Sequence, residues 1–108
     1  MTDNTKSILV LSAFPDPASA KSIAERLVNE KLAACVNVIP GVQSIFRWQG
    51  KIDNANENIL VIKTKDNLYN ELEERIKELH PYELPEIISV SIDKGLPKYL
   101  DWISESTK

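Results

Sequence analysis

Two short apolar runs place the strongest constraint on the fold of this chain. Residues 7–13 read Ser-Ile-Leu-Val-Leu-Ser-Ala and residues 59–64 read Ile-Leu-Val-Ile-Lys-Thr, and both compositions favour strands. Each run is followed by a turn signal and then by a segment whose apolar residues recur at helical spacing. A strand followed by a helix therefore occurs twice along the chain.

The two predicted helices have recognisable starts and apolar stripes. Asp16 is placed to cap the first, with Pro17 at its first position, and the pattern ends near Lys31. Asp66 is placed to cap the second. The apolar positions are Ala20, Ile23, Ala24, Leu27 and Val28 in the first helix and Leu68, Leu72, Ile76 and Leu79 in the second. On the exposed side of the second helix, four-residue spacing predicts the ion pairs Glu71–Arg75 and Glu73–Lys77.

The remaining segments complete the predicted order of elements. Residues 33–48 favour one long strand, which Pro40-Gly41 would bend and confine to a sheet edge. Residues 49–58 are polar and predict a hairpin connection into the strand at 59–64. A further apolar run at 87–92 predicts a fourth strand. Residues 97–104 predict a short C-terminal helix that docks through Tyr99, Leu100, Trp102 and Ile103.

This order, βαββαβ, predicts an α+β fold of the ferredoxin-like type, a sandwich with a long bent hairpin and a short C-terminal helix. Right-handed crossovers place both helices on one face of an antiparallel sheet. The runs at 8–11 and 59–62 are apolar at both odd and even positions, so the second face should also be buried. Another copy of the chain would cover it, which predicts a homo-oligomer. The alternative is that the C-terminal helix folds back over this face.

Composition limits the partners and the compartment. A chain of 108 residues predicts a single domain over residues 1–108. Its net charge is -3 without clustered Lys and Arg, which argues against nucleic acid as a partner. No stretch has the length of a membrane span or the layout of a signal peptide, so no membrane association is expected. One cysteine excludes an internal disulfide and favours the reducing cytoplasm.

The richest chemistry lies in residues 80–86, His-Pro-Tyr-Glu-Leu-Pro-Glu, which contain the only histidine. Two prolines make this segment a stiff linker between a helix and a strand. Imidazole and carboxylate are common ligands of divalent transition metals, so His80, Glu83 and Glu86 form a candidate metal site. The alternative is that the prolines only end the helix and start the strand, with the polar side chains in solvent.

Four further residues have both a structural and a functional interpretation. Lys63 ends an apolar strand face, where its ammonium either reaches water or holds an anion. Cys35 fills space in the core or binds metal. Trp48 and Tyr82 are amphipathic and serve an interface or a ligand site. The sequence contains no glycine-rich phosphate loop, no CxxC, no HExxH and no serine-hydrolase elbow, so we do not expect an enzyme.

Taken together, several motifs resemble the CutA family of divalent-cation tolerance proteins. The match runs from about Ser7 to Trp102 without evident insertions. It is carried by Lys31-Leu32-Ala33-Ala34-Cys35-Val36-Asn37, Pro40, Trp48-Gln49-Gly50-Lys51, Lys63-Thr64, His80-Pro81-Tyr82-Glu83 and Pro85-Glu86-Ile87.

The resemblance implies a ferredoxin-like protomer in a tight cytoplasmic homotrimer, similar to the PII signalling proteins, and an association with divalent metal ions, copper among them. It places Cys35, His80 and Glu86 among the metal candidates. It places Lys63, Tyr82 and Trp48 along a cleft between protomers. Because this chain has one cysteine, a copper site with several thiols from one chain is excluded.

Three functions remain open from the sequence. The first is a metal-binding, divalent-cation tolerance protein. The second is a PII-like sensor that binds a small anionic ligand through Lys63, while the hairpin segment 49–58 contacts a protein partner. The third is a structural trimer in which the polar cleft only aligns the subunits.

Overall fold

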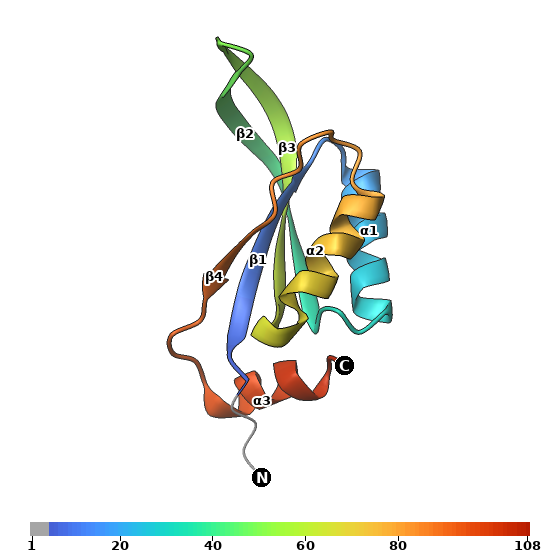
Figure 1. Cartoon of the computed structure of the whole chain (residues 1–108), viewed down its shortest axis with the longest axis vertical. Helices are drawn as coiled ribbons and strands as arrows, with labels where there is room; N and C mark the ends of the chain where they lie inside the picture. The colour runs from blue at the N-terminus through green and yellow to red at the C-terminus, as the bar shows by residue number, and fades with distance from the viewer. Residues whose placement is uncertain (1–4) are drawn as a thin grey trace.

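The computed structural model describes residues 5–108, and it has the predicted α+β architecture of one four-stranded antiparallel sheet and three helices (Figure 1). Two α-helices cover one face of the sheet, and the third lies at one end of it. The elements in chain order are β1 (Ser7–Phe14), α1 (Pro17–Asn29), β2 (Cys35–Trp48), β3 (Lys51–Lys65), a 3-10 turn (Asp66–Leu68), α2 (Tyr69–Leu79), β4 (Ile88–Ser91) and α3 (Pro97–Glu105).

The sheet has the strand order β2-β3-β1-β4, so β2 and β4 form its edges. As predicted, β2 is a single long edge strand. Its pairing with β3 shifts register between Ile39 and Val42, at Pro40-Gly41. Gly41 has φ 68°, a left-handed conformation that glycine adopts without strain. The bulge lets the strand bend and places the proline where no ladder hydrogen bond is lost.

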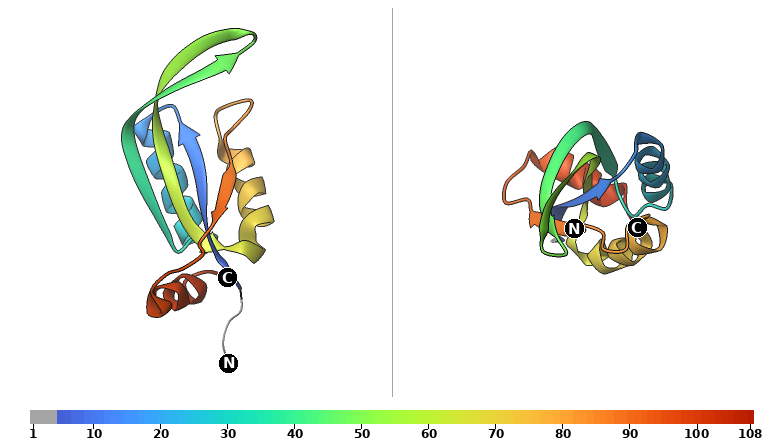
Figure 2. Two further views of the ribbon diagram at one scale, coloured as in Figure 1. Left: turned by 90° about the vertical axis from the view of Figure 1, so that its left-hand side faces the viewer. Right: turned by 90° about the horizontal axis from the view of Figure 1, so that it is seen from above.

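The prediction that residues 49–58 form a connection is wrong, because β3 begins at Lys51. The turn consists of Gln49 and Gly50, both at positive φ, which suits a tight hairpin. Residues 51–57 are polar yet pair with 42–48 of β2. Polar side chains are compatible with a strand here because the hairpin extends beyond the helices and is exposed to solvent on much of its surface (Figures 1 and 2).

The predicted cap of the first helix is confirmed, and that of the second is wrong. Asp16 accepts a hydrogen bond from the backbone N–H of Ser19 at 2.8 Å. Asp66 instead starts the 3-10 turn, and its backbone N–H donates to Lys6 O at 2.8 Å. The α-helix begins only at Tyr69, without a side-chain cap. The apolar stripe is nevertheless as predicted, since Leu72 and Ile76 are fully buried.

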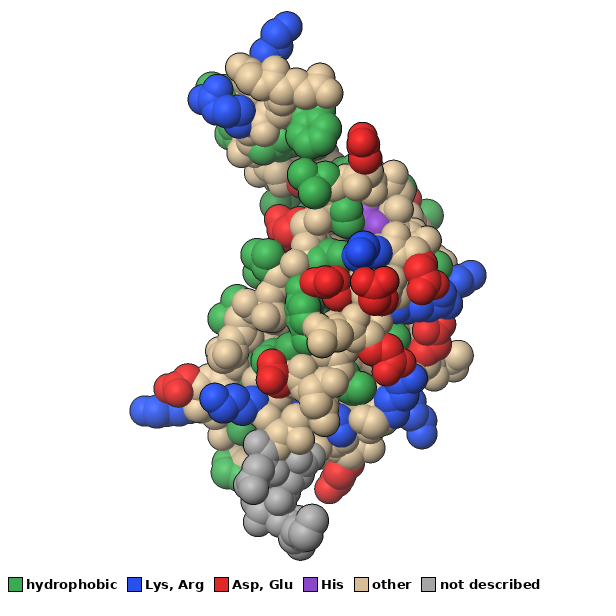
Figure 3. Space-filling model, viewed as in Figure 1, with side chains coloured by type: hydrophobic (Ala, Val, Ile, Leu, Met, Phe, Trp, Pro, Cys, Tyr) green, Lys and Arg blue, Asp and Glu red, His purple; other side chains and the backbone are tan. Residues whose placement is uncertain are grey.

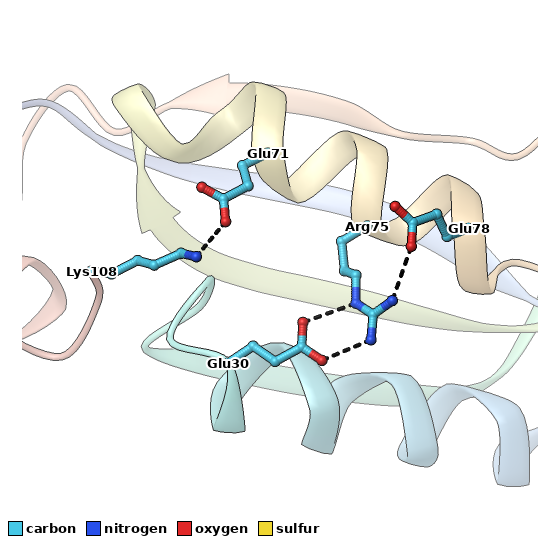
Figure 4. A network of polar contacts seen from close by, with 5 residues as sticks. All are labelled: Glu30, Glu71, Arg75, Glu78 and Lys108. Atoms are coloured by element: carbon cyan, nitrogen blue, oxygen red, sulfur yellow. Dashed lines mark hydrogen bonds and ion pairs between the residues drawn. The ribbon is translucent and has the colours of Figure 1, made fainter.

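Neither predicted ion pair on α2 forms, because Arg75, Glu71 and Lys77 pair with other side chains. Figure 4 shows the partners of Arg75 and Glu71. Arg75 donates from Nε and Nη2 to both carboxylate oxygens of Glu30, each at 2.9 Å, and from Nη1 to Glu78. This fork-shaped pairing lowers the pKa of Glu30. Glu71 pairs with Lys108 near the C-terminus, and Lys77 pairs with Glu74.

The core lies between the helices and one face of the sheet. In the sheet register, Ile62 lies opposite Val10, and both are fully buried. They pack with Leu60 and with the buried faces of α1 and α2. The odd-numbered positions of β1 and β3 point to the other face, which we call the open face.

The open face is apolar and only partly covered. Its rows include Leu9, Leu11 and Val61, which are half-buried, and Ile88 and Val90 of β4, which are 52% and 51% exposed. The alternative cover, the C-terminal helix, reaches only the Lys63 end of the sheet. Within α3, Ile103 is buried as predicted and Leu100 is half-buried, whereas Tyr99 and Trp102 remain exposed and contact each other. Within residues 5–108, a large apolar part of the open face therefore remains uncovered.

Candidate functional site

His80 is buried at the end of α2 and is held on three sides. Its imidazole stacks on Phe14 with a centroid distance of 4.2 Å. Nε2 lies 2.7 Å from Ala13 O, and Nδ1 accepts the backbone N–H of Tyr82 at 3.0 Å. The side chain is only 9% exposed, so the interpretation in which it projects into solvent is wrong. The sequence concealed this because the packing partner, β1, is distant along the chain.

These contacts determine the tautomer and protonation of the ring. A carbonyl oxygen can only accept, so Nε2 carries the proton and donates to Ala13 O, while Nδ1 has its lone pair free for the N–H of Tyr82. A second proton on Nδ1 would break that contact. Burial lowers the pKa of His80, although the Ala13 hydrogen bond and the charge of Glu57 act in the opposite direction. His80 is therefore held as a neutral Nε2–H imidazole.

Tyr82 connects this histidine to a carboxylate that sequence reasoning missed. Its hydroxyl donates to Oε2 of Glu57 at 2.9 Å, and its ring lies 5.0 Å from that of His80. Burial, followed by the hydrogen bond to Glu57, raises the pKa of Tyr82 to about 12. Glu57 was missed because residues 49–58 were interpreted as a connection. Extending the strand back from Ile59 by two residues would have placed Glu57 on the same face of the strand as Ile59.

A cleft of about 780 Å³ opens between the hairpin and residues 80–86, which we call the connector. The hairpin contributes Phe46 and Trp48, and the connector contributes Tyr82. The carboxylate-bearing residues in the lining are Asp53, Glu57, Glu83 and Glu86, and no Lys or Arg among residues 5–108 lines the cleft. In Figure 3, acidic and basic side chains are mixed over the side of α2, and basic side chains also lie at the far end of the hairpin. The carboxylates in the lining of the cleft favour a cation over an anion as its ligand.

The structure divides the predicted site residues into two groups. Trp48, Tyr82, Glu83 and Glu86 line the cleft, with His80 directly behind Tyr82. Cys35 and Lys63 are opposite each other in the β2–β3 register. Lys63 is four residues along β3 from Ile59, the partner of Ala13, and four residues span about 14 Å at ~3.4 Å per residue.

The second group has a different environment. Lys63 Nζ lies 5.7 Å from the centroid of the Tyr99 ring, and Cys35 is half-buried. Within one chain, neither residue reaches the cleft group. Within residues 5–108, no three His, Cys, Asp or Glu side chains gather closely enough to hold a metal ion. Any metal set with three protein ligands therefore needs a rearrangement or a second copy.

Comparison with known proteins identifies the relatives of this architecture. Residues 8–106 match the family model described as CutA1 divalent ion tolerance protein. The chain belongs to the CutA1 family. The Divalent-cation tolerance protein CutA of Thermus thermophilus is 46% identical over 99 residues, covering 92% of this chain and 96% of that protein. The crystal structure of CutA1 from Oryza sativa superposes with a TM-score of 0.93 at 41% identity, covering 95% of this chain and 94% of that chain.

Family membership supports divalent-cation tolerance as the function of this CutA1 member. A longer relative, Protein CutA, chloroplastic, of Arabidopsis thaliana, is 41% identical over 102 residues. The match covers 94% of this chain and 56% of the plant protein. None of the helices in residues 5–108 has the length and apolar composition that a membrane crossing requires.

Proposed function

We propose that this protein serves divalent-cation tolerance by binding the ions themselves, copper among them, at the mouth of the cleft, without catalysing a reaction. The observation that carries the proposal is the lining of the cleft. Acidic residues from the hairpin and the connector line one space, and no Lys or Arg in the described part of the same chain lines it. Carboxylate oxygens are ligands for divalent ions, and Cu(II) binds most nitrogen and oxygen sites more tightly than its neighbours in the series.

The proposed ligands are Glu83 and Glu86 on the connector, and His80, which lies behind Tyr82, is a third candidate. His80 can join only by giving up one of its two ring hydrogen bonds, because both nitrogens are engaged. Cys35 is a separate candidate, and its soft sulfur suits Cu(I). The connector carboxylates are thus the ligands that need the least rearrangement.

The proposed assembly is a homotrimer. The apolar open face supports it, since a second copy would remove Leu9, Leu11, Val61, Ile88 and Val90 from water. The single cysteine supports a cytoplasmic location as part of the same proposal.

Calorimetric titration with Cu(II) and with Zn(II) at pH 7.5 tests the metal site. The test variant is Glu83→Gln combined with Glu86→Gln. The matched control is Glu74→Gln combined with Glu105→Gln, which removes the same charge from exposed positions outside the cleft lining. We expect the test variant to lose at least about tenfold in Cu(II) affinity, because coordinating ligands are removed. Equal affinities in the two variants would contradict the proposed site.

A further inference from the structure

The end of the β2–β3 hairpin is basic and apolar, although the chain as a whole is acidic. Residues 42–52 contain Arg47 and Lys51 but no Asp or Glu, whereas the net charge of the chain is -3. Ile45 and Ile52 are 73% and 72% exposed, the highest values among the large hydrophobic side chains of residues 5–108. We call Ile45, Arg47, Lys51 and Ile52 the tip patch, and all four are exposed.

The tip patch lies largely apart from the surfaces already assigned. Arg47 is the partner of Ile52 in the β2–β3 register, so their side chains share one face of the hairpin. This face carries the even-numbered positions of β3, which nearer the body of the protein point to the helices rather than to the open face. The tip itself lies beyond the helices (Figures 1 and 2). Of the patch, only Ile45 also lines the cleft.

The hairpin holds the patch away from the acidic body of the molecule. Lys51 is six residues along β3 from Glu57, which Tyr82 ties to the connector, and six residues span about 20 Å. Charges in water are screened over about 8 Å at physiological ionic strength. The nearest acidic residue along the hairpin, Asp53, belongs to the cleft lining. The tip can therefore approach a negatively charged surface that would repel the body.

Exposed isoleucines beside two cations suit an anionic lipid surface. Lys and Arg are attracted to the headgroups, and apolar side chains enter the boundary with the acyl chains. A protein partner fits less well, because four residues at a hairpin end are far fewer than the roughly 20–30 on each side of a standard protein interface. We propose that the tip patch docks this protein peripherally on anionic membranes.

This docking goes beyond the proposed cation binding and needs no membrane-spanning segment. It would correct the expectation from sequence of no membrane association, which rested on the lack of a span and of a signal peptide. In the proposed homotrimer, cyclic symmetry would place three tips at one level along the axis, so that three weak contacts would reinforce one another.

Vesicle sedimentation of the full chain tests the proposal, with EDTA present so that divalent ions do not bridge protein and lipid. We expect binding to phosphatidylcholine vesicles with about one-third phosphatidylserine to be at least about tenfold tighter than to pure phosphatidylcholine. Arg47→Gln combined with Lys51→Gln should weaken binding to the anionic vesicles at least about tenfold. The matched control, Lys94→Gln combined with Lys98→Gln, removes two exposed charges near α3, at the other end of the molecule, and should change it less than about threefold.

A second matched pair tests the apolar part of the patch. Ile52→Ser and Leu96→Ser alter side chains that are 72% and 70% exposed, and Leu96 directly precedes α3. Ile52→Ser should weaken binding to the anionic vesicles at least about threefold, because less apolar surface enters the lipid, and Leu96→Ser should leave it unchanged. Equal binding to the two kinds of vesicle would overturn the proposal, as would equal losses in a tip variant and its control. Neither result would bear on the proposed cation site, which is titrated without lipid.

Discussion

Replacing His80 by alanine should destabilise the protein considerably. The change removes the donor to Ala13 O at 2.7 Å, the acceptor for the N–H of Tyr82 at 3.0 Å, and the ring stacked on Phe14. Two hydrogen bonds at about 0.5–1.5 kcal/mol each, with about 1 kcal/mol for the stacked ring, give a loss of about 2–4 kcal/mol. Such a loss would disagree with the interpretation from sequence in which the polar side chains of residues 80–86 lie in solvent.

The assay is denaturant unfolding at fixed protomer concentration in a chelator, from pH 5.5 to 7.5. The folded-state pKa of His80 is lowered below the ordinary value of 6.5. As pH falls through 6.5, the unfolded chain binds the proton first, so wild-type stability should fall while that of His80→Ala does not. The difference in unfolding free energy between wild type and His80→Ala should therefore become smaller toward pH 5.5. His80 is the only histidine, so parallel pH dependences of the unfolding free energy in the two proteins would contradict a lowered pKa of His80. A loss of unfolding free energy below about 0.5 kcal/mol at pH 7.5 would contradict the structural role of the ring.

Three further predictions test other parts of the account. Val10→Asp puts a charge in the core and should abolish folding, as measured by circular dichroism. Val61→Asp on the open face should lower the melting temperature and dissociate the proposed trimer, as measured by circular dichroism and sedimentation. A trimeric Val61→Asp with unchanged melting would argue against a buried open face. Tyr82→Phe removes the donor to Glu57 and should cost about 1–3 kcal/mol in unfolding free energy. Cys35→Ser should weaken Cu(I) binding more than Cu(II) binding in competition titrations, and equal losses would contradict its assignment as a soft ligand.

Strand order and layering were predictable because local signals and the hydrophobic pattern agree. The runs at 7–13 and 59–64 are strands, and Pro40-Gly41 forms the expected irregularity on an edge. The polar half of β3 was not predictable, because its pairing with β2 depends on a two-residue turn rather than on apolar alternation. The prediction of ion pairs on α2 was wrong for a similar reason, because Arg75 is oriented by Glu30 from the end of another helix.

The candidate site was predictable as a set of residues but not as a geometry. Trp48, Tyr82, Glu83 and Glu86, which the sequence singled out, line one cleft. Sequence could not indicate that both ring nitrogens of His80 are engaged, because one partner is the carbonyl of a residue 67 positions away. It also missed Glu57, whose role arises from tertiary contact with Tyr82.

The most direct test of the central claim is an anomalous difference map, at the copper absorption edge, from crystals grown with Cu(II). We expect a peak at the mouth of the cleft, within coordination distance of a carboxylate oxygen of Glu83 or Glu86. A map whose only copper peaks lie away from the connector and from Cys35 would contradict it. So would a map with no copper peak from crystals grown with the ion in excess.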